Sequence, residues 1–181
     1  GLGTVDLLTH DMGDSVGGEL LARDLAGHLG FQVRRRVLTN GSIYLDLAQL
    51  TTGQQLLLSL PDEAADLVQE EGYVTSLANT LASPDAAPRE ELAAQWELLR
   101  RNDGQRLLAR TIRYLEDRRA EERRYTGAIE DHPTPLGVVW GAEDPIAVAA
   151  MPERLAERVP HLRVDLLEEL LAAGERPAVV H

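Results

Sequence analysis

The sequence contains no cysteine and no lysine, and it does not begin with methionine. The absence of cysteine excludes a disulfide framework, a thiolate zinc site, an iron–sulfur cluster and a cysteine nucleophile. Positive charge is also scarce, because 18 basic residues face 30 acidic ones, for a net charge of -12 over 181 residues. This charge repels phosphate backbones and anionic lipids. We therefore expect a small, neutral molecule as the ligand, and neither nucleic acid nor a membrane as a partner.

The composition, 44% hydrophobic and 27% charged, is close to that of ordinary globular domains. It predicts one domain, or one domain with an inserted lobe. Gly1, Leu2 and Gly3 lead directly into an apolar run, with no signal peptide before it. We expect a cytoplasmic protein, and we expect this chain to be an internal piece of a longer one.

The first forty residues predict a strand, a helix and a second strand. The run Thr4-Val5-Asp6-Leu7-Leu8-Thr9 is short and apolar, as is typical of a buried strand. Apolar residues at helical spacing predict a helix over 15–29 with Gly30 as its stop, and residues 31–41 predict the next strand. Strand, helix and strand in this order imply parallel pairing.

Residues 45–125 show helical periodicity without strand signals. Breaks are expected at Pro61, at Gly72 and over 83–88, with single helices over 91–100 and 105–125. A strand over 136–141, a helix near 152–158 and a last strand over 162–167 follow. The pattern predicts an α/β fold, with a parallel sheet of about four strands and a helical cap inserted between them.

The chemistry of such a sheet is expected at the carboxyl ends of its strands, here the turns at 10–14, 40–41 and 141–145. The first turn offers two nucleophiles. Ser15 lies in a literal G-x-S-x-G pattern, whereas Asp11 lies in the turn two residues after Thr9, where the strand ends. A nucleophile elbow needs its reactive residue on the sharp turn after the strand, which favours Asp11 and leaves Ser15 as a helix cap.

His10-Asp11-Met12-Gly13-Asp14 resembles the His-Asp-x-Gly elbow of α/β-hydrolases with an aspartate nucleophile, the epoxide hydrolases and haloalkane dehalogenases. Leu38-Thr39-Asn40-Gly41 is similar to the end of the second strand in the mesoderm-specific-transcript-like branch. Trp140-Gly141-Ala142-Glu143-Asp144-Pro145 resembles the turn that supplies the triad acid in this superfamily. The resemblance implies part of an α/β-hydrolase fold.

By this resemblance Asp11 is the nucleophile that forms an ester intermediate, and Met12 lends its backbone N–H to the oxyanion hole. Asp144 orients a histidine that activates water for hydrolysis of the ester. The structural alternatives are a helix cap for Asp11, packing for Met12 and an ordinary turn for Asp144. The implied function is hydrolysis of an epoxide or ester-like electrophile without metal or cofactor.

The expected substrate-binding residues are Asn40, Tyr114 and Tyr125, with the tyrosines donating to the opening epoxide ring. Met12 stands where dehalogenases usually place a halide-binding tryptophan, and Trp96 is better interpreted as a core anchor. The base is unassigned, because no histidine closely follows the last strand. The five histidines are His10, His28, His132, His161 and His181.

The expected division is a sheet core with the elbow over 1–44, a helical cap over 45–128 and a sheet core with the acid turn over 129–181. Because the first strand corresponds to the middle of a hydrolase sheet, its apolar edge is expected to be open to pairing, and a homo-oligomer is one expected consequence. Two alternatives stay open, a serine hydrolase using Ser15 and a truncated relative that lacks activity.

Overall fold

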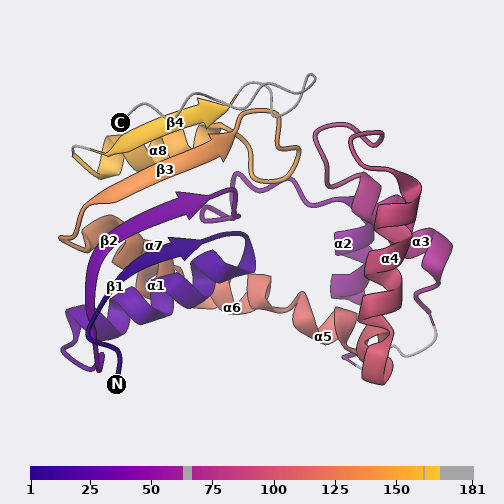
Figure 1. Ribbon diagram of the computed structural model, residues 1–181, viewed down its shortest axis with the longest axis horizontal. Coiled ribbons are helices and arrows are strands. Elements are labelled where there is room, and N and C mark those ends of the chain that lie inside the picture. The colour runs from indigo at the N-terminus through magenta and orange to yellow at the C-terminus, as the bar shows by residue number, and fades with distance from the viewer. Residues whose placement is uncertain (63–66, 161, 168–181) are drawn as a thin grey trace.

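The computed structural model describes residues 1–62, 67–160 and 162–167. Four parallel strands form one sheet in the order in which they occur along the chain (Figure 1). Their bounds are Thr4–Thr9 for β1, Gln32–Thr39 for β2, Leu136–Gly141 for β3 and Arg163–Leu167 for β4. The predicted parallel α/β sheet of four strands is confirmed.

Helices connect these strands. The helix α1, Met12–Leu25, joins β1 to β2, and α8, Ala150–Arg158, joins β3 to β4. A long helical insertion separates β2 from β3. Its elements are α2 (Thr52–Ser59), α3 (Glu70–Ala78), α4 (Arg89–Leu99), the 3-10 helix η1 (Arg101–Leu107), α5 (Leu108–Thr111), α6 (Tyr114–Ala120) and α7 (Glu122–Asp131).

The insertion divides between two places in the molecule. Helices α2 to α5 stand away from the sheet, at the end to which its strands point, and α6 runs between them and the sheet (Figure 1). Helix α7 instead packs along α1. A Cβ at Gly18 of α1 would come within 2.8 Å of the Tyr125 carbonyl oxygen, so glycine permits this close contact. The expected end of the cap at residue 128 thus lies inside a helix that packs on α1.

Three expectations for the helices were wrong. Helix α1 ends at Leu25, before Gly27, which has a φ of 71°, so the stop is not Gly30. Gly72 lies inside α3 and does not interrupt it. The helix expected over 105–125 is divided among the end of η1, α5, α6 and the start of α7.

The core fills the space between the sheet and its helices. Its fully buried side chains include Leu21 of α1, Val138 and Trp140 of β3, and Met151 and Leu155 of α8, each at most 1% exposed. The Trp140 indole N–H donates to the Ala147 carbonyl at 2.7 Å, which satisfies the one polar atom of this buried ring. This contact fixes the loop after β3 against the core.

Strand β1 forms one edge of the described sheet, with β2 as its neighbour. Thr9 is its only buried residue, and Leu8 is 70% exposed. The expectation of a buried strand is therefore wrong for the described residues, in which Thr4, Asp6 and Leu8 of β1 are all exposed. Met12 and Val16 of α1 are also exposed apolar side chains.

Candidate active site

The carboxyl ends of β1, β2 and β3 meet at one edge of the sheet because the strands are parallel. This brings the turn after Thr9, the turn after Thr39 and the turn after Gly141 together, although they are far apart in the sequence. The Asp11 N–H donates to the Asn40 carbonyl at 3.0 Å and joins the first two turns. Ligands of open parallel sheets bind at this edge.

Asp11 occupies the sharp turn between β1 and α1. Its φ is 52° and its ψ is -118°, a conformation that non-glycine residues adopt at a cost of the order of 1–3 kcal/mol. Its side chain is exposed, and the Tyr114 hydroxyl donates to the Asp11 Oδ1 at 3.1 Å. Met12 is the first residue of α1, where helix N–H groups have no acceptor within the helix.

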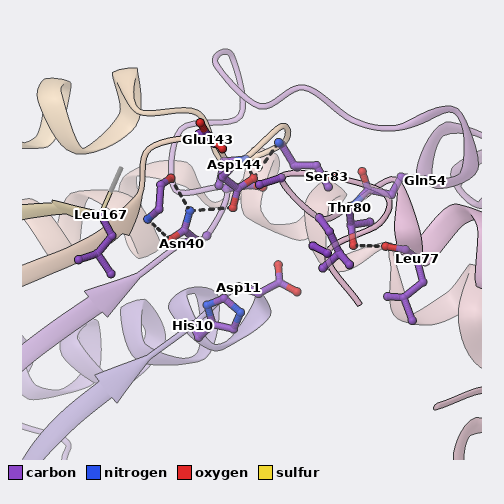
Figure 2. Close-up of a pocket in the computed structure, with 18 of the residues that line it drawn as sticks. His10, Asp11, Asn40, Gln54, Leu77, Thr80, Ser83, Glu143, Asp144 and Leu167 are labelled. Carbon is purple, nitrogen blue, oxygen red and sulfur yellow. Dashed lines mark hydrogen bonds between the residues drawn. The ribbon is translucent and has the colours of Figure 1, made fainter. Parts of the chain in front are cut away.

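Asp144 lies across the cavity from Asp11 and is held by three donors (Figure 2). Its Oδ1 accepts from the backbone N–H groups of Ile146 at 2.8 Å and Ala147 at 2.7 Å. Its Oδ2 accepts from the Asn40 Nδ2 at 2.7 Å. The orientation of this carboxylate is therefore determined by the protein itself.

Both polar atoms of the Asn40 side chain form hydrogen bonds that join the end of β2 to the end of β3 and the loop after it. Besides its bond to Asp144, its Nδ2 donates to the Gly141 carbonyl at 3.2 Å, and its Oδ1 accepts from the Gly141 N–H at 2.8 Å. Asn40 lines the cavity, but these three bonds make it a support for the acid turn. Its expected contact with a substrate stays a prediction.

A cavity of about 800 Å³ lies between this sheet edge and the cap. Figure 2 shows Asp11 on one side of it, Asn40 and Asp144 on another, and Gln54, Leu77 and Thr80 of the cap facing them. The acidic side chains of the lining are Asp11, Asp85, Glu143 and Asp144, and the lining includes no arginine among the described residues. The volume is that of a small-molecule site.

Ser15 lies inside α1, in the turn after its first residues, and does not line the cavity. Its hydroxyl oxygen accepts from the Arg118 Nε at 2.7 Å. Gly17 is the last residue of the G-x-S-x-G pattern. A Cβ at this position would come within 2.7 Å of the Thr9 Cγ2, so close packing explains why glycine stands there. The pattern therefore serves packing of α1 on β1.

The two tyrosines expected to face the substrate lie in different places. Tyr114 of α6 contacts Asp11, and its burial, followed by the negative charge of Asp11, raises its pKa above the usual range, so that its hydroxyl remains a donor. Tyr125 lies in α7 at the contact with α1, and neither tyrosine is among the residues that line the cavity. Trp96 is 5% exposed in α4, and its ring centroid is 5.4 Å from that of Tyr73.

Two buried charged residues near the elbow are not evident from the sequence. Asp14 is 1% exposed, with no hydrogen-bond partner for either carboxylate oxygen among the described residues. Its burial raises its pKa to about 7. Arg118 is also 1% exposed and donates to three oxygen atoms around the elbow. Local sequence gives no signal for either position, because each depends on packing between distant segments.

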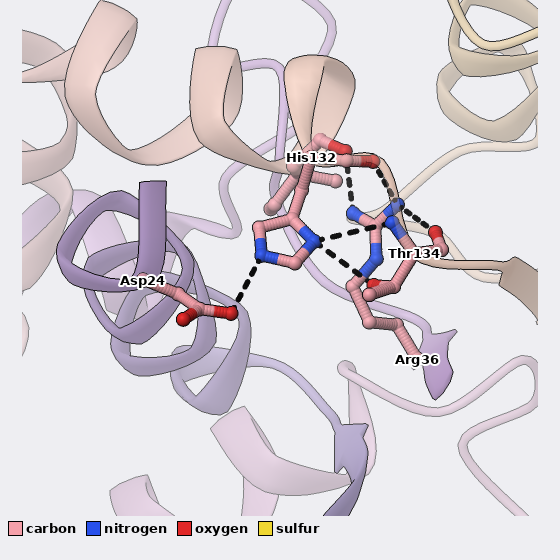
Figure 3. Close-up of polar contacts among 5 residues, drawn as sticks. Asp24, Arg36, His132 and Thr134 are labelled. Atoms are coloured by element: carbon pink, nitrogen blue, oxygen red, sulfur yellow. Dashed lines mark hydrogen bonds and ion pairs between the residues drawn. The ribbon is translucent and has the colours of Figure 1, made fainter. Parts of the chain in front are cut away.

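Of the histidines, His10 lines the cavity, and its Nδ1 lies 3.0 Å from the Thr39 Oγ1. His28 is exposed beyond the end of α1. His132 lies at the opposite end of the sheet, before β3, where its ring contacts the Asp24 Oδ2 at 3.1 Å and the Thr134 Oγ1 at 2.9 Å (Figure 3). His161 and His181 fall outside the described residues.

Within the described residues, no cluster of three or more histidine, aspartate or glutamate side chains is arranged to hold a metal ion. In the same part of the chain, no helix combines the length and the apolar character needed to cross a membrane. The polar groups that line the cavity around Asp11 include His10, Asn40 and Asp144, and the Tyr114 hydroxyl contacts the Asp11 carboxylate without lining the cavity.

Curated relatives are similar to most of this chain. A Mycobacterium tuberculosis protein named "Putative hydrolase LipZ" is 43% identical over 178 residues, which are 98% of this chain and 61% of the relative. The mesoderm-specific transcript protein of Mus musculus is 28% identical over 157 residues, which are 78% of this chain and 44% of that protein. The chain therefore spans less than two thirds of the length of these relatives. No family model matches the sequence.

Solved structures share the fold. A meta-cleavage product hydrolase has a TM-score of 0.64 at 12% identity, over 91% of this chain and 56% of its own. An alpha/beta hydrolase fold protein from Burkholderia ambifaria has a TM-score of 0.62 at 21% identity, over 90% of this chain and 57% of its own. With its parallel sheet, its inserted helices and this coverage, the chain has part of an α/β-hydrolase fold.

Proposed function

We propose that this chain carries the nucleophile, cap and acid turn of a hydrolase that acts on a small neutral electrophile, an epoxide or an ester-like compound. The observation that carries the proposal is Asp11, which has a positive φ in the turn between β1 and α1 and lines the cavity across from Asp144. Proteins retain such backbone strain where the fold determines it fully, often at active sites.

In the first step the Asp11 carboxylate attacks an electrophilic carbon of the substrate and forms an ester bond. With an epoxide, the carbon–oxygen bond of the ring breaks, and the leaving oxygen takes a proton. The Tyr114 hydroxyl, 3.1 Å from the Asp11 Oδ1, is the proposed donor of this proton. Its raised pKa keeps it protonated at neutral pH, as this role requires.

In the second step water attacks the carbonyl carbon of the ester, and the product alcohol leaves. The backbone N–H of Met12 is the proposed donor to the oxyanion that develops on the Asp11 side chain. Asp144 is the proposed partner of the histidine that takes a proton from the water. Its two backbone donors and Asn40 hold it in a fixed orientation suited to this task.

Asp11 is a better candidate than Ser15, although one structural neighbour is a serine hydrolase. Ser15 lies within α1 beside a buried guanidinium, which cannot act as a base toward its hydroxyl. Epoxide or ester hydrolysis is favoured over dehalogenation, because Met12 follows Asp11 and Trp96 packs on Tyr73 within the cap. The acidic lining favours neutral substrates over anionic ones.

The test is to incubate the full chain with styrene oxide in water enriched in oxygen-18 and to analyse its peptides by mass spectrometry. Hydrolysis through an ester places one heavy oxygen in the Asp11 carboxylate, and slow hydrolysis leaves the substrate bound to Asp11. Asp11→Asn should abolish both signals and lower turnover by at least about a thousandfold.

Ser15→Ala is the matched variant, and it should keep both signals at Asp11. Labelling of Ser15 by a fluorophosphonate probe that persists in Asp11→Asn would establish the serine mechanism instead. If neither residue is modified and no epoxide or activated ester is consumed, the chain is a relative without this activity.

A further inference from the structure

Arg118 places a buried charge under the elbow. Its guanidinium donates from Nε to the Ser15 Oγ at 2.7 Å, from Nη1 to the Ser42 carbonyl and from Nη2 to the Asp11 carbonyl at 3.2 Å. Among the described residues no carboxylate forms an ion pair with it. Burial of an arginine that bonds only neutral oxygen atoms is costly. Unlike the buried Arg36, Arg118 bonds the backbone carbonyl of Asp11, a residue that lines the cavity.

The neighbouring arginines of this region behave differently. Arg113, just before α6, pairs with the carboxylates of Asp62 and Glu116 and is partly exposed. Arg119 is exposed. Tyr114 and Arg118, four residues apart in the sequence, lie on one face of α6, and the guanidinium carbon is 5.3 Å from the ring centroid. One face of this helix therefore bonds both the carboxylate and the backbone carbonyl of Asp11.

The contact with the Asp11 carbonyl determines the direction of the next N–H group. This carbonyl accepts from the Arg118 Nη2 and from the Asp14 N–H at 3.1 Å. In a planar trans peptide the C=O and the following N–H point in opposite directions. Two donors on the oxygen thus fix the Met12 N–H, and because one of them is a cation, it also polarises the peptide and strengthens that N–H as a donor.

We propose that Arg118 is a positioning residue that orients and polarises the Asp11–Met12 peptide, with Ser15 and Ser42 as its anchors. The catalytic part of this inference rests on the proposed function, because the Met12 N–H matters for the oxyanion of the second step. The inference also assigns a role to Ser15, whose hydroxyl holds the guanidinium in place. Loss of Arg118 should slow hydrolysis of the ester more than its formation.

The first measurement does not depend on activity. The sequence has two methionines, so labelling with nitrogen-15 methionine gives two amide signals, Met12 and Met151. Met151 is fully buried in α8 and reports whether the core is intact. In Arg118→Met the Met12 signal should move upfield, as expected for a less polarised N–H, while the Met151 signal stays in place. Arg119→Met is the matched control and should move neither signal.

The second measurement separates the two chemical steps. In single turnovers with styrene oxide, Arg118→Met should hydrolyse the Asp11 ester about ten to a hundred times more slowly, less than the full loss of an oxyanion donor. Formation of the ester should change by less than about threefold. The ester should therefore accumulate in this variant and not in Arg119→Met.

Other outcomes decide against the proposal. If the Met12 signal does not move in a folded variant, or if formation and hydrolysis of the ester slow equally, Arg118 only stabilises the packing of α6. If Arg118→Met does not fold, Arg118→Lys keeps the charge but cannot reach all three oxygens, and the same two measurements apply to it. If wild type forms no ester, the proposed function fails, whereas the shift of the Met12 signal still tests the effect of Arg118 on the peptide.

Discussion

The two ends of the parallel sheet both carry dense polar networks, but they differ in what they face. At the carboxyl end, Asn40 and Asp144 bond each other beside a space of about 800 Å³. At the opposite end, where β3 begins, Arg36 donates to the carbonyls of Ile129, His132 and Thr134 (Figure 3). This second network is closed, since Arg36 is 2% exposed and His132 is 6% exposed.

The difference between the two ends of the sheet shows that a paired acid and histidine do not by themselves identify an active site. His132 and Asp24 resemble half of a catalytic triad, yet the ring is buried and its second nitrogen faces Thr134. Arg36 closes that end of the sheet by binding the carbonyls at and after the end of α7, where a cation is favourable. Function is expected at the other end, where carboxylates reach a cavity.

The largest effect on stability is expected from Arg36→Met at the closed end. The change removes three donors and leaves three carbonyls unsatisfied in the interior. We expect the free energy of unfolding to fall by about 3–5 kcal/mol, because each interior carbonyl that loses its donor costs about 1–3 kcal/mol and loss of the buried charge offsets part of the sum. Urea unfolding followed by circular dichroism measures this loss.

Asn40→Leu is the matched change at the open end. It removes the links from β2 to Gly141 and Asp144, but this region is only partly buried, so the expected loss of stability is about 1–2 kcal/mol. Its main effect should be slower hydrolysis of the Asp11 ester. If Asn40→Leu cost more stability than Arg36→Met, the contrast between a structural and a functional end would be wrong.

The next prediction concerns Asp14, the buried carboxyl close to the turn between β1 and α1. Its pKa of about 7 in the folded protein is above the ordinary value of 3.8, so the folded state binds its proton more tightly than the unfolded state does. Stability should therefore decrease as the pH rises from about 4 to about 7. Asp14→Asn should remove this decrease and raise stability at pH 8 by about 2–4 kcal/mol.

Urea unfolding of both proteins at pH 4.5 and at pH 8 tests this expectation. The gain should be present at pH 8 and nearly absent at pH 4.5, where wild-type Asp14 is already neutral. The measurement at pH 4.5 is the control, because it compares the same two proteins where the Asp14 charge is absent. A gain that is equal at both pH values would mean that desolvation of the Asp14 charge is not the cause.

The strands were predictable from the sequence because each is a short apolar run between turn residues. The β1 bounds of Thr4–Thr9 and the β3 bounds of Leu136–Gly141 agree with the runs seen in the sequence. The cap helices were less predictable, since their polar surfaces give weak periodicity. At Asn102 and Asp103 the chain turns through positive φ, in the gap between the helices expected over 91–100 and 105–125.

The position of Asp11 in the candidate site was predictable, because a local pattern determines it. The apolar run ends two residues before Asp11, and this spacing predicts that Asp11 lies on the turn. The serine of the G-x-S-x-G pattern then falls inside the following helix, as the structure has it. The contacts of Tyr114 with Asp11 and of Arg118 with Ser15 join residues 103 positions apart, and no pattern near the elbow indicates them. Such pairings follow from the packing of α6 and become visible only in three dimensions.

The smallest expected effect is at His132, whose pKa burial lowers from the ordinary value of 6.5, with hydrogen bonding to Asp24 opposing part of that shift. The unfolded chain then binds the proton more tightly than the folded protein, so stability should fall as the pH drops below 6.5. His132→Asn should remove this acid-side loss. Urea unfolding at pH 5 and pH 8 measures it, and it should be smaller than the effect of Asp14.

The two titrating groups thus change the stability of the protein in opposite directions of pH. His132 lowers stability as the pH falls, and Asp14 lowers it as the pH rises. Asp24→Asn sharpens the comparison, because loss of this carboxylate removes the partner that raises the pKa of His132. The acid-side loss of stability should then become steeper while the base-side loss from Asp14 is unchanged. If both sides changed together, the two ends would be coupled through the core instead of titrating independently.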